Sequence, residues 1–455
     1  MSQPHPTPRR FGRVLVYGLG LSGRAALSLL AARGTGELLA ADDRPAGEID
    51  LSGLPDVKVL AGEQVPSILP EGVEAVVLSP GVPHDKPLLE DVRRRGVPVL
   101  AEVELAFPEA RGPIVGITGS NGKSTTTALT GALLESAGHR VAVCGNIGKP
   151  LAQAVLEDAE RTFVVELSSF QLETVDRFHP KAAAYLNLTP DHLDRYPSLD
   201  AYAAAKERLF RNQGPGDVSV VNAADPRTRE ARTDGRKRMF SSRGRIEDGC
   251  WLDGESIVET APGEPPHLLF ERSDLTLPGE HNLENAMAAA LLARALGVES
   301  EALRRGLRGF RGLPHRMEKV AEIGGVTYYD DSKGTNTGAT LRSLEGLPDG
   351  SVHLILGGSD KGEDYSVLAP VVRTKAARVY LIGESAGDIQ AALGAAVPTE
   401  ISGTLERAVG AAARDARPGE TVLLSPACAS FDQFRNFVHR GEVFASLVTA
   451  LEEAR

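Results

Sequence analysis

The sequence predicts an α/β protein built from three domains. Short runs of Val, Leu and Ile alternate with helix-compatible stretches along the chain, a rhythm typical of parallel sheets covered by helices on both faces. The 455 residues exceed the length at which one hydrophobic core keeps growing. Gly, Pro and Arg cluster at residues 107–113 and 309–316, which we interpret as linkers. We therefore expect domains at residues 1–108, 109–312 and 313–455.

Each domain has its own series of predicted strands. The first series comprises residues 13–19, 37–42, 75–80 and 97–102. The second comprises residues 113–119, 140–146, 162–169, 182–188 and 218–223, and the third residues 326–332, 353–358, 379–383 and 421–427. Between Met239 and Leu277, short turn-separated pieces indicate a small antiparallel sheet. Helices are expected at residues 281–297 and 444–455.

Composition excludes several classes of protein. A net charge of -11 argues against a general nucleic-acid-binding protein, although local basic pockets for small anions stay compatible with it. Cys144, Cys250 and Cys428 are far apart and lack metal-ligand spacing, which favours a reducing compartment, and we expect the cytoplasm. No stretch approaches a membrane span and the polar N-terminus has no signal-peptide pattern, so no membrane partner is expected.

A first glycine-rich turn follows the first predicted strand. Gly18, Gly20 and Gly23 form G-x-G-x-x-G within VLVYGLGLSGRA, and Asp42 ends the next strand. The pattern is typical of a nicotinamide-cofactor site, but a tight turn around any diphosphate needs the same glycines. Other motifs in the sequence are needed to distinguish a nicotinamide cofactor from another diphosphate ligand.

A second loop, GITGSNGKSTT at residues 116–126, indicates a nucleoside-triphosphate site. Gly119 and Gly122 allow a tight turn, Lys123 reaches terminal phosphates and Ser124 offers a hydroxyl to Mg²⁺. The loop departs from the strict pattern because Ile117 stands where the first glycine is expected, and a Gly-rich turn with an exposed lysine is the alternative. A triphosphate loop weakens the nicotinamide interpretation, because hydride transfer needs no ATP.

Polar residues end the next strands of the second series. Glu166 and Ser168 follow one strand, and Asp191 and His192 follow another. A carboxylate and an imidazole at this sheet edge suit a hard cation near phosphates. Taken alone, a histidine such as His192 is more often a loop residue with an ordinary hydrogen bond, but its position beside Glu166 and Lys123 favours the ligand interpretation.

Together these motifs resemble the Mur ligases of peptidoglycan synthesis. The resemblance covers YGLGLSG and SPGVP in the first domain, GITGSNGKSTT, GNIG, ELSSFQL, PDHLDRY and HNLENAMAA in the second, and LPHRME, YDDSKGTN, GGSDKGEDY and SPACASFDQFRNFVHRGEVF in the third. It implies a Rossmann-like N-terminal domain, a central P-loop ATPase-like α/β domain with the small antiparallel sheet, and a C-terminal Rossmann-like α/β domain. It also implies ATP-dependent ligation of D-glutamate to UDP-N-acetylmuramoyl-L-alanine through an acyl phosphate, in a chain that we expect to be a monomer with two Mg²⁺ ions.

The resemblance assigns residues to each ligand. The UDP-linked substrate would meet Leu19, Ser22, Asp42, Asp43, Arg44, Gly81, Asn146, Ser168 and His192. ATP would meet Gly119, Ser120, Asn121, Gly122, Lys123, Ser124, Thr125, Asn282, Asn285, Arg316, Asp331 and Lys333. D-glutamate would meet Thr335, Lys361, Ser430, Phe431 and Phe437. The family often has Thr where this chain has Asp43 and Leu where it has Phe431, and closure of the third domain on the second is expected to complete the ATP site.

Four residues carry the implied catalysis, Lys123, Glu166, His192 and Lys206, and the implied metal ligands are Ser124, Glu166, His192 and Lys206. Helical spacing beside Glu207 and Arg208 makes Lys206 read as a surface lysine. The family resemblance instead implies a carbamylated lysine that offers oxygens to a second Mg²⁺.

Two other functions compete with this one. A sister ligase, such as a folylpolyglutamate synthase or another Mur enzyme, would share the ATPase domain, but the pair DDSKGTN and SPACASFDQF argues against it. A nucleotide-binding regulator would use the loop as a switch without ligation. Phosphate release that depends on the UDP-linked substrate would separate a ligase from such a regulator.

Overall fold

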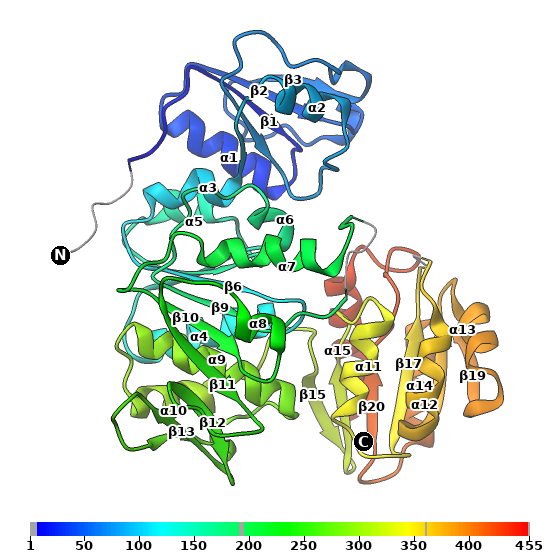
Figure 1. The fold of residues 1–455 in the computed structure, drawn as a ribbon. Coiled ribbons are helices and arrows are strands. Elements are labelled where there is room, and N and C mark those ends of the chain that lie inside the picture. The colour runs from blue at the N-terminus through cyan, green and yellow to red at the C-terminus, as the bar shows by residue number, and fades with distance from the viewer. Residues whose placement is uncertain (1–6, 191–194, 360–361, 454–455) are drawn as a thin grey trace. The chain divides into compact units, whose positions relative to one another are not determined.

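The computed structural model describes residues 7–190, 195–359 and 362–453. They form two compact units, the first comprising the described residues up to Thr276 together with His281–Phe310, and the second comprising Leu277–Glu280 and the described residues from Arg311 onward. Three sheets with helices on their faces confirm the predicted α/β class (Figure 1).

The first sheet is wholly parallel, with the order β3-β2-β1-β4-β5. Its strands are β1 (Arg13–Tyr17), β2 (Glu37–Asp42), β3 (Lys58–Ala61), β4 (Ala75–Leu78) and β5 (Val99–Ala101). The helical elements beside it are α1 (Leu21–Ala32), η1 (Ala46–Glu48), η2 (Gly62–Gln64) and α2 (Pro87–Arg94). Chain order reverses between β1 and β4, and such a switch point leaves a crevice at the carboxyl ends of the strands.

The second sheet has the order β14-β13-β12-β11-β10-β9-β6-β8-β7. Its strands are β6 (Ile114–Thr118), β7 (Val141–Gly145), β8 (Thr162–Glu166), β9 (Ala182–Tyr185), β10 (Val218–Asn222), β11 (Arg236–Ser241), β12 (Gly249–Asp253), β13 (Ser256–Thr260) and β14 (His267–Glu271). The expected antiparallel pieces are β12, β13 and β14. They extend the parallel strands through the parallel pair β11–β12, so the antiparallel part is one end of a larger sheet.

The helical elements of this region are α3 (Glu102–Ala106), η3 (Phe107–Glu109), α4 (Lys123–Ser136), α5 (Leu151–Glu157), α6 (Ser169–Leu172), α7 (Leu199–Glu207), η4 (Arg208–Phe210), α8 (Pro226–Glu230), η5 (Arg272–Asp274), α9 (Glu280–Ala295) and α10 (Ser300–Gly309). Helix α1 packs against α3 and α5, so the core of the first sheet continues toward the second. The buried carboxylate of Glu104 accepts the backbone N–H groups of Asp176, Arg177 and Phe178, which fixes α3 to the following segment.

The third sheet belongs to the second unit and has the order β15-β16-β20-β17-β18-β19. Its strands are β15 (Glu318–Ile323), β16 (Val326–Asp330), β17 (Val352–Gly357), β18 (Ala376–Ile382), β19 (Thr399–Gly403) and β20 (Thr421–Leu424). The helical elements are α11 (Thr337–Glu345), η6 (Tyr365–Leu368), α12 (Ala369–Lys375), α13 (Ala386–Leu393), η7 (Gly394–Ala396), α14 (Leu405–Asp415) and α15 (Phe437–Glu453). The last helix therefore begins at Phe437, earlier than the predicted residue 444.

Gly23 lets α1 approach β1, and its replacement is expected to weaken that contact. A Cβ atom at Gly23 would lie 1.9 Å from the carbonyl oxygen of Gly18. We expect Gly23→Ala to lower the opening free energy of the β1 amides, measured by hydrogen exchange, by about 1–3 kcal/mol, the usual cost of overpacking. Gly20→Ala is the matched control, because no atom lies within 4 Å of its Cβ position. Equal protection in both variants would contradict this packing.

Candidate substrate and nucleotide sites

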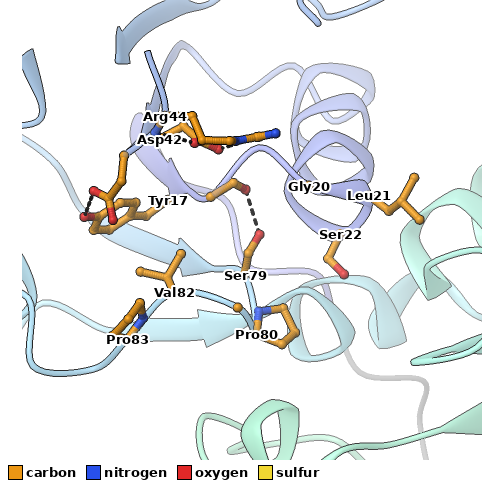
Figure 2. Close-up of a pocket in the computed structure, with 13 residues that line it drawn as sticks. Tyr17, Gly20, Leu21, Ser22, Asp42, Arg44, Ser79, Pro80, Val82 and Pro83 are labelled. Atoms are coloured by element: carbon orange, nitrogen blue, oxygen red, sulfur yellow. Dashed lines mark hydrogen bonds and ion pairs between the residues drawn. The ribbon is translucent and has the colours of Figure 1, made fainter. Parts of the chain in front are cut away.

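A pocket of about 520 Å³ opens at the carboxyl ends of β1, β2 and β4 (Figure 2). It is lined by Tyr17, Gly18, Gly20, Leu21, Ser22, Asp42, Asp43, Arg44, Ser79, Pro80, Gly81, Val82 and Pro83. Five residues assigned to the UDP-linked substrate are among them, namely Ser22, Asp42, Asp43, Arg44 and Gly81. The switch point of the first sheet thus carries a cavity of the size used for small-molecule ligands.

The amino end of α1 borders this pocket. Its cap residue, Gly20, supplies no side-chain hydrogen bond, and the first turn contains no acidic residue. The first N–H groups of a helix have no acceptor within the helix, so they attract an anion such as a diphosphate.

Leu19 and Leu21 differ in position. The side chain of Leu19 is buried and its N–H donates to Asp42 Oδ2 at 2.7 Å, and Leu19 is not among the residues that line the pocket. Leu21, which sequence analysis did not select, is 72% exposed and lines the pocket. The sequence carried a signal for this exposed position, because Leu21 is an apolar residue in the first turn of α1 that lies outside the buried face of the helix.

Asp42 holds the glycine-rich turn and Arg44 in place at the pocket. Arg44 donates from Nε to Asp42 Oδ1 and from Nη2 to Asp42 Oδ2, both at 2.9 Å. These hydrogen bonds hold the pKa of Asp42 at about 2, below its usual value. Because Leu19 also donates to this carboxylate, Asp42 acts as a scaffold for the turn and for Arg44.

The second glycine-rich loop joins β6 to α4. Gly122 caps α4 with φ of 79°, a conformation that favours glycine. A Cβ atom there would lie 2.3 Å from Asn285 Oδ1, so the loop and α9 leave no room for a side chain. Thr126 donates to Asn285 Oδ1 at 3.2 Å, and Asn285 donates to Asn282 Oδ1 at 3.4 Å. The structure therefore brings the two asparagines of α9 to the predicted phosphate loop.

Lys123 lies over its own loop. Its Nζ donates to the carbonyl oxygens of Gly119 and Ser120, each at 2.9 Å. Neighbouring loop residues are engaged elsewhere, since the N–H of Asn121 donates to Asn187 Oδ1 and Ser120 Oγ donates to the carbonyl of Thr189. These bonds fix the conformation of the loop backbone.

Glu166 ends β8 and has an unsatisfied oxygen. The side chain is buried, and Oε1 accepts from Asn146 Nδ2 at 2.8 Å. Its Oε2 is buried and finds no hydrogen-bond partner among the described residues. An oxygen of this kind suits a hard cation. His192 and its neighbour Asp191 lie outside the described residues.

Ser168 has a structural role in the folded chain. It is the N-cap of α6, where its hydroxyl accepts from the N–H of Gln171 while Gln171 Oε1 accepts from the N–H of Ser168. This capping box turns the chain directly after Glu166.

Lys206 is buried, although its helical neighbours favour a surface position. The side chain is 1% exposed, and Nζ lies 4.4 Å from the centre of the Tyr202 ring. Nζ also donates to the carbonyl oxygen of Gly119 at 2.8 Å. The surface-lysine interpretation is therefore wrong, and Lys123 and Lys206 share one loop carbonyl.

In the second unit, the loop after β16 carries several predicted residues. Asp331 Oδ2 accepts from Ser343 Oγ and Ser425 Oγ, both at 2.7 Å. Burial raises the pKa of Asp331 to about 6 despite these bonds. Lys333 Nζ lies 3.9 Å from the centre of the Phe437 ring. Lys333, which was expected to contact ATP, therefore lies against Phe437, which was expected to contact D-glutamate.

The other residues expected at D-glutamate differ in exposure. Ser430 is buried, Thr335 and Phe437 are half-buried, and Phe431 is 71% exposed. Lys361 lies outside the described residues. Ser430 and Phe431 follow β20 on one loop, whereas Thr335 follows β16.

Arg440, which was not among the residues selected from the sequence, organises these loops. Its guanidinium is buried and donates to the carbonyl oxygens of Ser332, Cys428 and Ala429. Burial lowers the pKa of Arg440 to about 10. The signal was a lone arginine between Phe437 and Phe444 on a helix face that is otherwise apolar.

Comparison with known proteins identifies the class. Three family models match in order: the Mur ligase MurD-like N-terminal domain at residues 12–101, the Mur ligase middle domain at residues 117–293, and the Mur ligase glutamate ligase domain at residues 315–428. The chain belongs to the Mur ligase family.

Individual relatives and one solved structure are similar to this chain over nearly its full length. The UDP-N-acetylmuramoylalanine–D-glutamate ligase of Anaeromyxobacter dehalogenans is 47% identical and that of Solibacter usitatus 44%, each alignment covering 97% of this chain and 98% of the relative. The UDP-N-acetylmuramate-alanine ligase MurC of Thermotoga maritima has a similar fold, with a TM-score of 0.60 and 17% identity over 96% of this chain and 99% of that one. In the part of the chain that the structure describes, no helix has the length and apolarity needed to cross a membrane.

Proposed function

We propose that the chain joins D-glutamate to UDP-N-acetylmuramoyl-L-alanine in an ATP-dependent step of peptidoglycan biosynthesis. The observation that carries this proposal is identity of 40–47% to ligases of that name over nearly the full length of the chain. The pocket of the first sheet and the loop before α4 support it, since each lies at the amino end of a helix, where a diphosphate or a triphosphate would bind. We also propose a monomer located in the cytoplasm.

The reaction consists of two transfers. A carboxylate oxygen of the UDP-linked substrate attacks the γ-phosphorus of ATP, which releases ADP and leaves an acyl phosphate. The amine of D-glutamate then attacks the acyl carbon, loses a proton, and expels phosphate from a tetrahedral intermediate. The site must therefore stabilise charge on the transferring phosphoryl group and hold an amine against an activated carbonyl.

We propose that the first unit performs the phosphoryl transfer. The amino end of α4 and Lys123 would hold the triphosphate, with Ser120, Asn121, Thr125, Asn282 and Asn285 also assigned to ATP. Mg²⁺, which Mur ligases use in general, would neutralise phosphate charge at Ser124, Glu166, His192 and Lys206. The unpartnered Oε2 of Glu166 supports this assignment. We further propose that two Mg²⁺ ions bind there and that Lys206 carries a carbamate.

The remaining ligands are assigned by region. The nucleotide end of the UDP-linked substrate would occupy the 520 Å³ pocket. Asn146, Ser168 and His192 would contact the same substrate farther from its nucleotide end. Arg316, Asp331 and Lys333 are assigned to ATP, and Thr335, Lys361, Ser430, Phe431 and Phe437 to D-glutamate. We propose that residues 1–108, 109–312 and 313–455 are the domains that bind the UDP substrate, ATP and the amino acid.

The choice of amino acid tests this function. D-glutamate should be ligated, whereas L-glutamate and D-alanine should be poor substrates, because one has the wrong handedness and the other lacks the carboxylate that Lys361 would pair. The measurement is product formation by mass spectrometry with ATP and UDP-N-acetylmuramoyl-L-alanine. Phosphate release that needs no UDP-linked substrate would point to a nucleotide-binding regulator, and equal ligation of all three amino acids would reject the assignment.

A further inference from the structure

The pocket of the first sheet is lined by two neighbouring carboxylates, Asp42 and Asp43, which differ in their hydrogen-bond partners. In sheets of this class, the acid that ends the second strand usually accepts a ribose hydroxyl. Here that acid is Asp42, and Leu19 and Arg44 already donate four hydrogen bonds to its two oxygens. Asp42 therefore has no ready capacity for a ligand donor.

Asp43 is the carboxylate that lines the pocket with capacity left. Tyr17 donates its hydroxyl to Asp43 Oδ1 at 2.7 Å, and Lys86 Nζ lies 2.7 Å from Asp43 Oδ2. Each oxygen therefore has one protein partner, although a carboxylate offers about four acceptor positions. The Asp43 side chain is 45% exposed, so a ligand in the pocket can reach it.

The two partners come from separate elements. Tyr17 ends β1, where its ring is buried, and Lys86 precedes α2. Burial opposes the charge of Asp43, but the hydrogen bonds from Lys86 and Tyr17 outweigh it and the pKa lies below the usual range. The carboxylate is thus oriented from two sides.

Charge at the pocket is balanced in pairs. Arg44 neutralises Asp42, and Lys86 neutralises Asp43. An anionic ligand is therefore not repelled, and its diphosphate would favour the uncapped amino end of α1 rather than the carboxylate of Asp43. A hydrogen-bond donor of the same ligand suits Asp43.

We propose that Tyr17 and Lys86 are positioning residues that fix Asp43 as the acceptor for a hydrogen-bond donor of the uridine moiety. This inference rests on the proposed function, which places a UDP-linked substrate in the pocket. Three groups of uridine have the required chemistry, the imide N3–H of the base and the 2′- and 3′-hydroxyls of the ribose. The Asp43–Lys86–Tyr17 set then contributes to selection of the nucleotide end of the substrate.

Calorimetry with UDP and the full-length chain tests the positioning role. Lys86→Met and Tyr17→Phe should each weaken UDP binding on the order of tenfold, the scale of one hydrogen bond to a charged group. Lys86→Arg should retain most of the affinity, because it keeps a donor cation. In ligation assays, Lys86→Met should raise KM for the UDP-linked substrate far more than it changes kcat. Lys58→Met is the matched control, since this exposed lysine lies in β3 and does not line the pocket.

Modified nucleotides identify the donor. The 3-methyluridine, 2′-deoxyuridine and 3′-deoxyuridine diphosphates each lack one candidate group, and the one whose group contacts Asp43 should bind wild type on the order of tenfold more weakly than UDP. Asp43→Ala should bind that analogue and UDP equally. Unchanged UDP affinity in Lys86→Met and Tyr17→Phe, or wild-type binding that is indifferent to all three modifications, would overturn the inference alone. A wild-type chain that does not bind UDP would instead contradict the proposed function.

Discussion

Lys123→Ala is expected to lower turnover by roughly 10²–10³-fold, the scale observed when one preorganised charge-stabilising donor is removed. Lys123 begins α4, and its Nζ lies 2.9 Å from the carbonyl oxygens of Gly119 and Ser120, over the loop that would hold the triphosphate. Without this cation, charge that develops on the transferring phosphoryl group would lose a fixed positive charge that stabilises it. The measurement is kcat from ADP release at saturating substrates.

The matched control is Lys181→Ala. Lys181 precedes β9, at the opposite end of the strands from the loop, and its side chain is 48% exposed. Its removal should leave turnover nearly unchanged. Lys123→Ala should also bind the UDP-linked substrate normally, because the pocket of the first sheet contains no residue of the loop. A large loss of UDP-substrate affinity by calorimetry would contradict this separation of roles.

Lys206→Arg is expected to be nearly inactive with UDP-substrate binding preserved. Lys206 is buried beside the Gly119 carbonyl, where a cation would repel the divalent metal proposed at Glu166. Carbon dioxide can add to a neutral lysine amine to give a carbamate and a released proton, which supplies two anionic oxygens. Arginine keeps the positive charge and does not react in this way. The measurement is ligation rate together with calorimetry of the UDP-linked substrate.

A second measurement separates carbamylation from crowding by the larger arginine side chain. Removal of carbon dioxide from the buffer should depress wild-type activity, and added bicarbonate should restore it. Lys206→Arg should not respond to bicarbonate. Retention of most activity by Lys206→Arg would support an ammonium role, and the proposed second metal ion would then need other ligands.

Most central strands were predictable from sequence, whereas three of the six outer strands were not. The run VLVY in β1 is continuously apolar because both faces of the sheet are covered, and its burial confirms that prediction. β3, β15 and β19 were missed, and each is an outer strand of its sheet, although the outer strands β5, β7 and β14 lie in predicted segments. Edge strands need few apolar residues, so a segment such as EKVAEI in β15 carries no clear pattern.

The candidate sites were predictable where the backbone itself supplies the chemistry. Gly18 and Gly23 mark the pocket and Gly122 marks the phosphate loop, because close approach leaves no room for a Cβ atom at these three positions. Residues brought in by tertiary packing gave weaker signals. Lys206 meets Gly119 across 87 positions of sequence, and the contact of Tyr17 and Lys86 with Asp43 likewise depends on the folded sheet.

Transfer of an oxygen atom tests the central claim most directly. UDP-N-acetylmuramoyl-L-alanine labelled with ¹⁸O in its carboxylate is incubated with the chain, ATP, Mg²⁺ and D-glutamate, and the phosphate and the ligated product are analysed by mass spectrometry. Ligation through an acyl phosphate predicts one ¹⁸O atom in each phosphate released, with one ADP and one D-glutamate-containing product formed per phosphate. Unlabelled phosphate, or ATP hydrolysis without the D-glutamate product, would contradict the account.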